Sequence, residues 1–127
     1  MSNRINVSKT YKIFIGGKFL RTESGRYYKL EVKNKFIANI CLSSKKDLRN
    51  AVVASRNAFD VWSRFSAYKR SQILYRIAEM MEGRKAQFIE EIILQGINPS
   101  TAKKEINTII DRIIYYAGWA DKTNQVF

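Results

Sequence analysis

The sequence contains a single cysteine, Cys41, and a cysteine thiolate is a strong nucleophile toward a carbonyl carbon. The chain has no histidine, so the commonest general base near neutral pH is missing. Activation of the thiol would depend on Lys45, on Lys46 or on the start of a helix near Ser44, since positive charge favours the thiolate. We interpret Cys41 as a small buried or half-buried residue and keep a catalytic role as the alternative.

Two short glycine motifs, Gly16-Gly17 and Ser24-Gly25, could be considered as phosphate-binding loops. A dinucleotide site requires several spaced glycines between a strand and the N-terminus of a helix. Neither motif has that spacing. Both are therefore interpreted as turns.

Acidic side chains are paired at Glu79 with Glu82 and at Glu90-Glu91. Their spacing and their basic neighbours are typical of a solvated helix surface rather than of an acid and base pair. With a single cysteine the chain cannot form an internal disulfide, which fits a reducing compartment. With one cysteine and no histidine, the sequence has no Cys/His motif of the kind that binds a metal. The residues therefore indicate no catalytic site, no cofactor-binding site and no metal site.

Three aromatic residues, Tyr115, Tyr116 and Trp119, gather near the end of the chain. Aromatic rings beside basic residues can stack on the bases of single-stranded nucleic acid. Their spacing is that of a helix, however, and we interpret them as packing residues.

The charge is large and uneven for a chain of 127 residues, with a formal net charge of +12. Residues 1–49 hold 12 Lys and Arg against 3 acidic residues, whereas residues 50–127 hold 11 against 8. Such a bias can attract nucleic acid or anionic lipid. The favoured interpretation is that basic residues line exposed strand edges, where they maintain solubility and prevent pairing with other chains.

The first third of the chain has the pattern of two β-hairpins. Residues 1–10 are polar and basic and are expected to be flexible. Residues 11–43 hold the hairpins: the first spans 11–20 and turns at Gly16-Gly17, where both residues can adopt positive φ. The second pairs strands at 27–33 and 36–42.

Residues 44–127 have helical periodicity and are predicted to form three amphipathic helices. The first spans about 45–64 after the capping pair Ser44 and Asp47, the second runs from Ser66 to about residue 95, and the third begins at Asn98-Pro99. The predicted core-facing positions are Leu48, Val52, Ser55, Phe59 and Trp62 in the first helix, Ile73, Ile77, Met80 or Met81, Phe88, Ile92 and Ile93 in the second, and Ile106, Ile109, Ile110, Ile113, Ile114 and Ala117 in the third. No linker or repeat interrupts the chain, so residues 1–127 are predicted to form one α+β unit.

Several of these segments together resemble the N-terminal part of NAD(P)-dependent aldehyde dehydrogenases, from about residue 11 to residue 124. The strongest marker is the run Arg112-Ile-Ile-Tyr-Tyr-Ala-Gly-Trp-Ala-Asp-Lys122. The others are Phe14-Ile-Gly-Gly-Lys-Phe19, Ser24-Gly25, Ile37-Ala38, Asp47 with Ala51-Val52, Ala58-Phe59 with Trp62, and Ile73-Leu74 with Ile77-Ala78. Each is weak alone, but together they follow the order found in the family.

The resemblance implies the fold of the opening segment of the coenzyme-binding domain. The family's nucleophilic cysteine, general-base glutamate, oxyanion asparagine and dinucleotide-binding helix start come later in such chains, so none is carried over to a position here. In the family the turn of the second hairpin usually has Asn-Pro and Gly, which are missing here, so a shorter or distorted turn is expected. A structural cation site is not carried over, because the run that ends at Pro99 lacks the family's Asp and Lys.

Three hypotheses about function follow. In the first, the chain is an aldehyde dehydrogenase segment, related to oxidoreductases that use NAD(P) but inactive alone and without a cofactor of its own. In the second, it is a small interaction protein that docks on a full-length relative, on a complementary fragment or on its own copies through apolar helix faces that lack a covering sheet. In the third, it binds nucleic acid through its basic N-terminal half. We expect a cytoplasmic protein, since no run of about eighteen apolar residues occurs.

Overall fold

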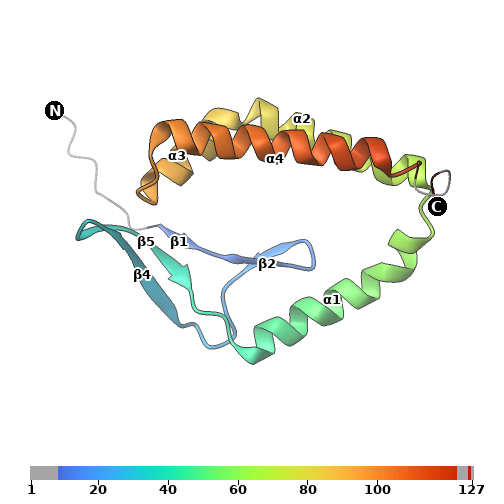
Figure 1. Cartoon of the computed structure of the whole chain (residues 1–127). Coiled ribbons are helices and arrows are strands. Elements are labelled where there is room, and N and C mark those ends of the chain that lie inside the picture. Colours follow the sequence, from blue (N-terminus) through green and yellow to red (C-terminus); the bar gives the residue numbers. More distant parts are fainter. Residues whose placement is uncertain (1–8, 123–125, 127) are drawn as a thin grey trace. The chain divides into compact units, whose positions relative to one another are not determined.

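Five strands precede four helices in the computed structural model, which describes residues 9–122 and Val126 (Figure 1). The chain divides into two units, residues 1–62 and 63–127, and each is described here by itself. The flexible segment expected at residues 1–10 lies largely outside the described residues, although Thr10 already belongs to a strand. The prediction of one structural unit stays a prediction.

Among the residues that the structure describes, the first unit contains the five strands and nearly all of one helix. Its strands form a three-stranded sheet of order β1-β5-β4 and a separate two-stranded sheet of β2 and β3. Strand β1 runs parallel to β5, while β4 and β5 are antiparallel. The elements are β1 (Thr10–Tyr11), β2 (Ile13–Ile15), β3 (Lys18–Leu20), β4 (Tyr27–Val32), β5 (Lys35–Cys41) and α1 (Lys45–Ser63).

The first hairpin is confirmed but is shorter than predicted. Gly16 and Gly17 have φ values of 59° and 78° and join β2 to β3 in a two-residue turn that pairs Ile15 with Lys18. If the same register continued, Tyr11 would pair with Thr22. Thr22 instead belongs to the next turn, and its carbonyl accepts a hydrogen bond from the backbone N–H of Gly25. Residues 10–11 therefore pair with β5 instead of extending the hairpin.

The second hairpin is also confirmed, and its connection is short, which is one of the two alternatives that were expected. Lys33 and Asn34 form a two-residue turn with φ values of 51° and 61°, which are the positive values that a tight hairpin turn requires. The strand register shifts between Leu30 and Glu31, which is a β-bulge that increases local twist.

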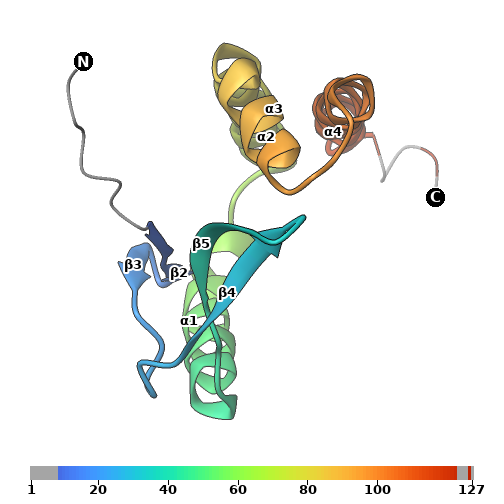
Figure 2. The same ribbon diagram turned by 90° about the vertical axis from the view of Figure 1, so that its left-hand side faces the viewer.

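The second unit consists of α2 (Ala67–Gly83), α3 (Lys85–Leu94) and α4 (Pro99–Trp119). Ser66 caps α2 by accepting a hydrogen bond from the backbone N–H of Lys69, and Asn98 caps α4 through the N–H of Ser100. Figure 2 shows α4 lying beside α2. Both predicted helix starts are confirmed.

The prediction of one helix from Ser66 to about residue 95 is wrong, because Arg84 interrupts it. Arg84 has φ −113° and ψ 16°, outside the helical region, and its N–H donates to the carbonyl of Met81 rather than continuing the α-helical ladder. Gly83, a weak helix former, comes just before it. The described residues therefore form four helices where three were predicted.

The core of the second unit lies where α2 and α3 meet α4. Ala78, Ile106 and Ile110 are buried there, and partly buried apolar side chains surround them: Met81, Ile89, Ile92, Ile109 and Ile113. Ala102 and Ala117 are fully buried. The hydroxyl of Ser71 donates a 2.7 Å hydrogen bond to the carbonyl of Ala117, which fixes α2 against α4.

One predicted core face points elsewhere. Ile77, Met80 and Phe88 have exposed fractions of 42%, 50% and 38%, and we call these three residues the outer stripe. Met81, the predicted alternative to Met80, packs against the core instead, next to Ala78. On α2 the prediction was therefore right at Met81 and wrong at Ile77 and Met80.

Candidate functional site

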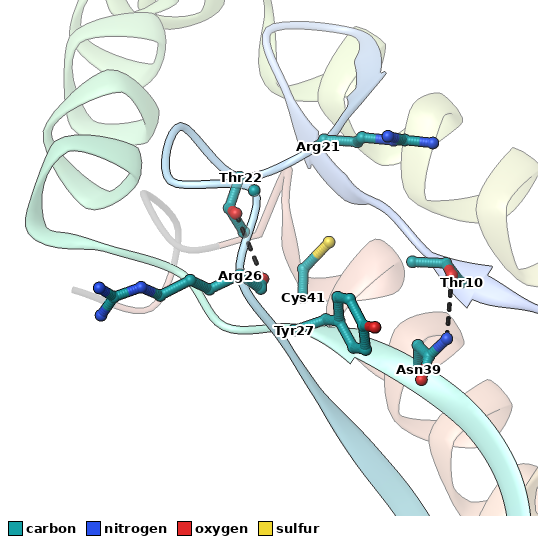
Figure 3. Close-up of a pocket in the computed structure, with 8 residues that line it drawn as sticks. Thr10, Arg21, Thr22, Arg26, Tyr27, Asn39 and Cys41 are labelled. Atoms are coloured by element: carbon teal, nitrogen blue, oxygen red, sulfur yellow. Dashed lines mark hydrogen bonds between the residues drawn. The ribbon is translucent and has the colours of Figure 1, made fainter.

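Cys41 lies at the carboxyl end of β5, and its thiol is free and half-buried. It lines a pocket of about 220 Å³ between the sheet and the turn that follows β3 (Figure 3). The other lining residues are Thr10, Arg21, Thr22, Gly25, Arg26, Tyr27 and Asn39. This pocket is the one place in the first unit where a nucleophile and several polar groups come together among the described residues.

The polar groups of the pocket bond mainly to each other. The hydroxyl of Thr22 donates to the carbonyl of Arg26 at 3.4 Å, and the amide nitrogen of Asn39 donates to the hydroxyl of Thr10 at 3.4 Å. Figure 3 shows the guanidinium groups of Arg21 and Arg26 directed away from the sulfur of Cys41, on opposite sides. The lining contains no carboxylate, lysine or histidine, so no general base accompanies the thiol.

The turn that forms one wall of this pocket is attached to α1 through Asp47. One carboxylate oxygen accepts the backbone N–H of Glu23 at 2.9 Å, and the other accepts both the N–H and the hydroxyl of Ser44, at 2.7 and 2.9 Å. The capping pair predicted from the sequence is therefore present, and the bond to Glu23 adds a connection to the preceding turn. That long-range bond has no signal in the local sequence pattern.

These bonds shift the ionisation of Asp47, which is 4% exposed. The backbone N–H groups of Ser44 and of Glu23, in that order, hold the pKa of Asp47 below its ordinary value of 3.8. The Ser44 hydroxyl and the Lys46 ammonium act in the same direction, and burial opposes them. Asp47 therefore carries its charge as a structural acceptor, not as a proton donor.

The glycine motifs form turns, as predicted. Gly16 and Gly17 connect two antiparallel strands, and Gly25 has φ 67° in the turn after β3. Neither motif lies between a strand and the N-terminus of a helix, which is the position from which backbone N–H groups bind a dinucleotide pyrophosphate. Neither of these two turns therefore provides a pyrophosphate site of that kind.

The acidic candidates lie on the surface of the second unit. Glu79 forms an ion pair with Arg76 at 2.6 Å, and Glu82 forms one with Lys85 at 3.1 Å. Glu90 is exposed on α3. No three residues of the types His, Cys, Asp and Glu gather in a metal-binding arrangement within residues 9–122.

The aromatic residues near the end of α4 contact each other and remain open to solvent. Tyr115 packs edge to face on Tyr116, with ring centroids 5.4 Å apart, and lies 6.2 Å from the ring centroid of Trp119. The exposed fractions of Tyr115 and Tyr116 are 59% and 63%. Tyr115, Tyr116 and Trp119 therefore pack against one another, as predicted. Neither tyrosine enters the core of the second unit.

Many large apolar side chains are exposed to solvent in both units. Four of the five positions predicted to face the core from the first helix are large and apolar, and all four are exposed: Leu48, Val52, Phe59 and Trp62. The outer stripe lines a groove of about 250 Å³ together with Met81 and Arg84.

None of the described helices is both long enough and apolar enough to cross a bilayer. The predicted location in the cytoplasm stays a prediction.

The architecture is thus an α+β arrangement of hairpins and amphipathic helices. The chain belongs to the aldehyde dehydrogenase family, whose model matches residues 22–126. It corresponds to an N-terminal part of the family fold. Both the resemblance seen in the sequence and the fold class expected from it are confirmed.

Curated relatives show how much of the family this chain represents. The D-glyceraldehyde dehydrogenase (NADP(+)) of Thermoplasma acidophilum is 32% identical over 117 residues, which cover 89% of this chain and 24% of the relative. The cytosolic 10-formyltetrahydrofolate dehydrogenase of Mus musculus is 28% identical over 125 residues, covering 94% and 14%. The chain therefore spans about a quarter or less of the length of these proteins.

Solved structures of relatives also match this chain over about a quarter of their length. The NAD-dependent aldehyde dehydrogenase of Sinorhizobium meliloti superposes with a TM-score of 0.82 at 26% identity, over 94% of this chain and 25% of that one. The NAD+ complex of the Bacillus cereus aldehyde dehydrogenase gives a TM-score of 0.84 at 25% identity, over 91% and 25%. The strands and helices described above are thus part of a larger fold in these relatives.

Proposed function

We propose that this chain supplies the opening strands and helices of an aldehyde dehydrogenase fold and does not by itself oxidise aldehydes. In the reaction class suggested by the family, an aldehyde is oxidised to an acid, water supplies the added oxygen, and NAD(P) accepts the hydride. The chain would act as a structural part of such an oxidoreductase. The observation that supports this proposal is that no carboxylate, lysine or histidine is among the residues that line the Cys41 pocket.

The thiol of Cys41 has no base in its pocket, and the glycine turns do not provide a pyrophosphate site. Nucleophilic catalysis by cysteine requires a thiolate within reach of both a substrate and a proton acceptor. The guanidinium groups of the two arginines in the pocket are hydrogen-bond donors only and offer no acceptor atom. A scaffold role accounts for the well-formed hairpins and helix caps without requiring chemistry at Cys41.

The test is an activity assay of the purified chain with NAD or NADP and a panel of small aldehydes, followed through absorbance of the reduced cofactor. We expect no rate above the blank, and the same result for Cys41→Ala. Thermal unfolding with and without each cofactor should also coincide, since a ligand that binds only the folded state raises its stability. A cofactor-dependent rate that Cys41→Ala abolishes would show that the chain is an enzyme and would refute the proposal.

A further inference from the structure

Strand β4 forms an open edge of the three-stranded sheet. The strand order β1-β5-β4 leaves one side of β4 without a neighbouring strand among the described residues (Figure 1). β4 has six residues, whereas β1, the strand at the opposite edge, has two. An open edge of this length presents a row of backbone N–H and C=O groups that can pair with another strand.

The free edge of β4 is regular along its length. Between its pairs with Leu30 and Glu31, strand β5 has one extra residue, Ile37. The β-bulge therefore lies on β5, and its unpaired residue is on the side away from the open edge. β4 itself remains extended from Tyr27 to Val32, as is required of a strand that accepts a neighbour.

Alternate residues of β4 direct their backbone groups to the open edge. The N–H of Leu42 donates to the carbonyl of Arg26, which immediately precedes β4 and so faces β5. In an antiparallel pair, residues that face the partner alternate with residues whose N–H and C=O point to the other side. The groups on the open edge are therefore those of Tyr27, Lys29 and Glu31.

The sequence of β4 is complementary to itself when two copies pair antiparallel about Leu30. In that register Lys29 of one copy lies opposite Glu31 of the other, and the two-fold symmetry repeats this pair. Both residues direct backbone groups to the open edge, so each pair also exchanges two backbone hydrogen bonds. On the other face of the two strands, Tyr28 lies opposite Val32, next to the two Leu30 side chains.

Charge selects this partner over an unrelated strand. A lysine on an edge strand prevents pairing with strands that offer it no acidic residue. In the antiparallel copy Lys29 meets Glu31, and opposite charges across a strand pair stabilise it, whereas like charges destabilise it. Both side chains are exposed. The net charge of +12 opposes association, but salt at about 0.15 M screens charges beyond roughly 8 Å and affects cross-strand pairs at about 5 Å much less.

We propose that β4 is a docking edge for a second copy of this chain, which pairs with it antiparallel about Leu30, so that the sheet continues from one copy into the other. The inference does not depend on the proposed function, because it uses only strand pairing and charge. The contact between two short strands is small, so the dimer is weak and forms at high protein concentration.

Sedimentation of the full chain over a concentration series, in about 0.15 M salt, measures this dimer. Glu31→Lys places a lysine opposite Lys29, and Lys29→Glu places a glutamate opposite Glu31. We expect each substitution to weaken dimerisation about tenfold or more, because both cross-strand pairs change from attractive to repulsive. An equimolar mixture of the two variants should dimerise like the parent, since each charge then meets its opposite.

Net charge alone predicts a different result. Lys29→Glu lowers the net charge of the chain by two units, and Glu31→Lys raises it by two. If long-range repulsion controlled association, Lys29→Glu would strengthen the dimer. Lys18→Glu makes the same charge change at an exposed position on β3 and should dimerise at least as well as the parent. All three positions are exposed, so the variants should keep the circular dichroism spectrum of the parent.

Four results would overturn the inference. A parent chain that stays monomeric at all concentrations would show that the edge takes no second copy. Dimerisation that Lys29→Glu leaves unchanged or strengthens would place the contact on another surface. A mixture that dimerises no better than the separate variants would refute the register about Leu30. A lower unfolding temperature for Glu31→Lys, with a monomeric parent, would place a segment of the chain itself on the edge.

Discussion

At the scale of single residues, the carboxylate of Asp47 holds two segments of the first unit together. Its two oxygens receive hydrogen bonds from Glu23 on one side and from Ser44 on the other. Asparagine has one carbonyl oxygen in place of two carboxylate oxygens, so it can replace only one of these acceptors. Cys41, the residue most suggestive of chemistry, lacks comparable partners for a reaction.

We predict that Asp47→Asn lowers the thermal stability of the chain near neutral pH. The pKa of Asp47 is lower in the folded state than its ordinary value of 3.8, so folding favours the charged form. The resulting stabilisation is present above about pH 4 and is lost as the pH falls through the folded-state pKa. The difference in unfolding temperature between the parent and Asp47→Asn should therefore shrink below about pH 4. Asp111→Asn, at an exposed position on α4, is the control. A difference that does not vary with pH would contradict the assignment.

At the scale of elements, the turns are defined by backbone conformation. Both hairpins use two-residue turns with positive φ, but only the first has glycines there. At Lys33 a residue with a Cβ occupies the left-handed region, with φ 51°, at a steric cost that glycine avoids. The second hairpin is thus less stable with lysine at position 33 than it would be with glycine there.

Lys33→Gly is predicted to raise the free energy of unfolding by up to about 1 kcal/mol, because it removes this steric cost. Urea denaturation followed by circular dichroism measures the change. Lys29→Gly, in the extended strand β4, provides the opposite case and should destabilise the chain by about 0.5–1 kcal/mol. If both substitutions had the same sign, the left-handed conformation at Lys33 would not be the cause.

At the scale of the whole molecule, the basic residues determine how the chain meets polyanions. Several lysines of the hairpins are exposed, including Lys18 on β3 and Lys29 on β4, which are both edge strands in the sheet order. This placement agrees with the interpretation that they keep strand edges soluble and unpaired. It also keeps nucleic-acid binding as an alternative that solution measurements can test.

We predict that the chain elutes from heparin and from a sulfonate cation exchanger at similar salt concentrations, since both would retain it through net charge alone. The comparison is made on the intact chain under the same buffer conditions. Elution from heparin at much higher salt, together with binding to single-stranded DNA, would support the nucleic-acid hypothesis. In that case Tyr115→Ala should weaken the DNA complex, because an exposed aromatic ring can stack on a base.

The elements that were predicted correctly depend on short-range interactions. Gly16-Gly17 forms a turn because both residues adopt positive φ, and Ser66 and Asn98 begin helices because their side chains cap nearby N–H groups. The break at Arg84 was missed because the apolar period continues through it, from Met80 to Phe88. A periodic pattern shows where a helix can form but not where it stops.

The sequence alone determined the family, the order of hairpins and helices, and the absence of a histidine or a cysteine pair for chemistry. Tertiary structure decided the rest: the pairing of β1 with β5, the bond from Glu23 to Asp47, and the stripe of α2 that faces α4. These contacts join residues far apart in the chain, so no local pattern specifies them. On α2, Ala78 and Met81 pack against the core formed with α4, whereas Ile77 and Met80 are left exposed, and that choice depends on the position of α4 rather than on the period of α2.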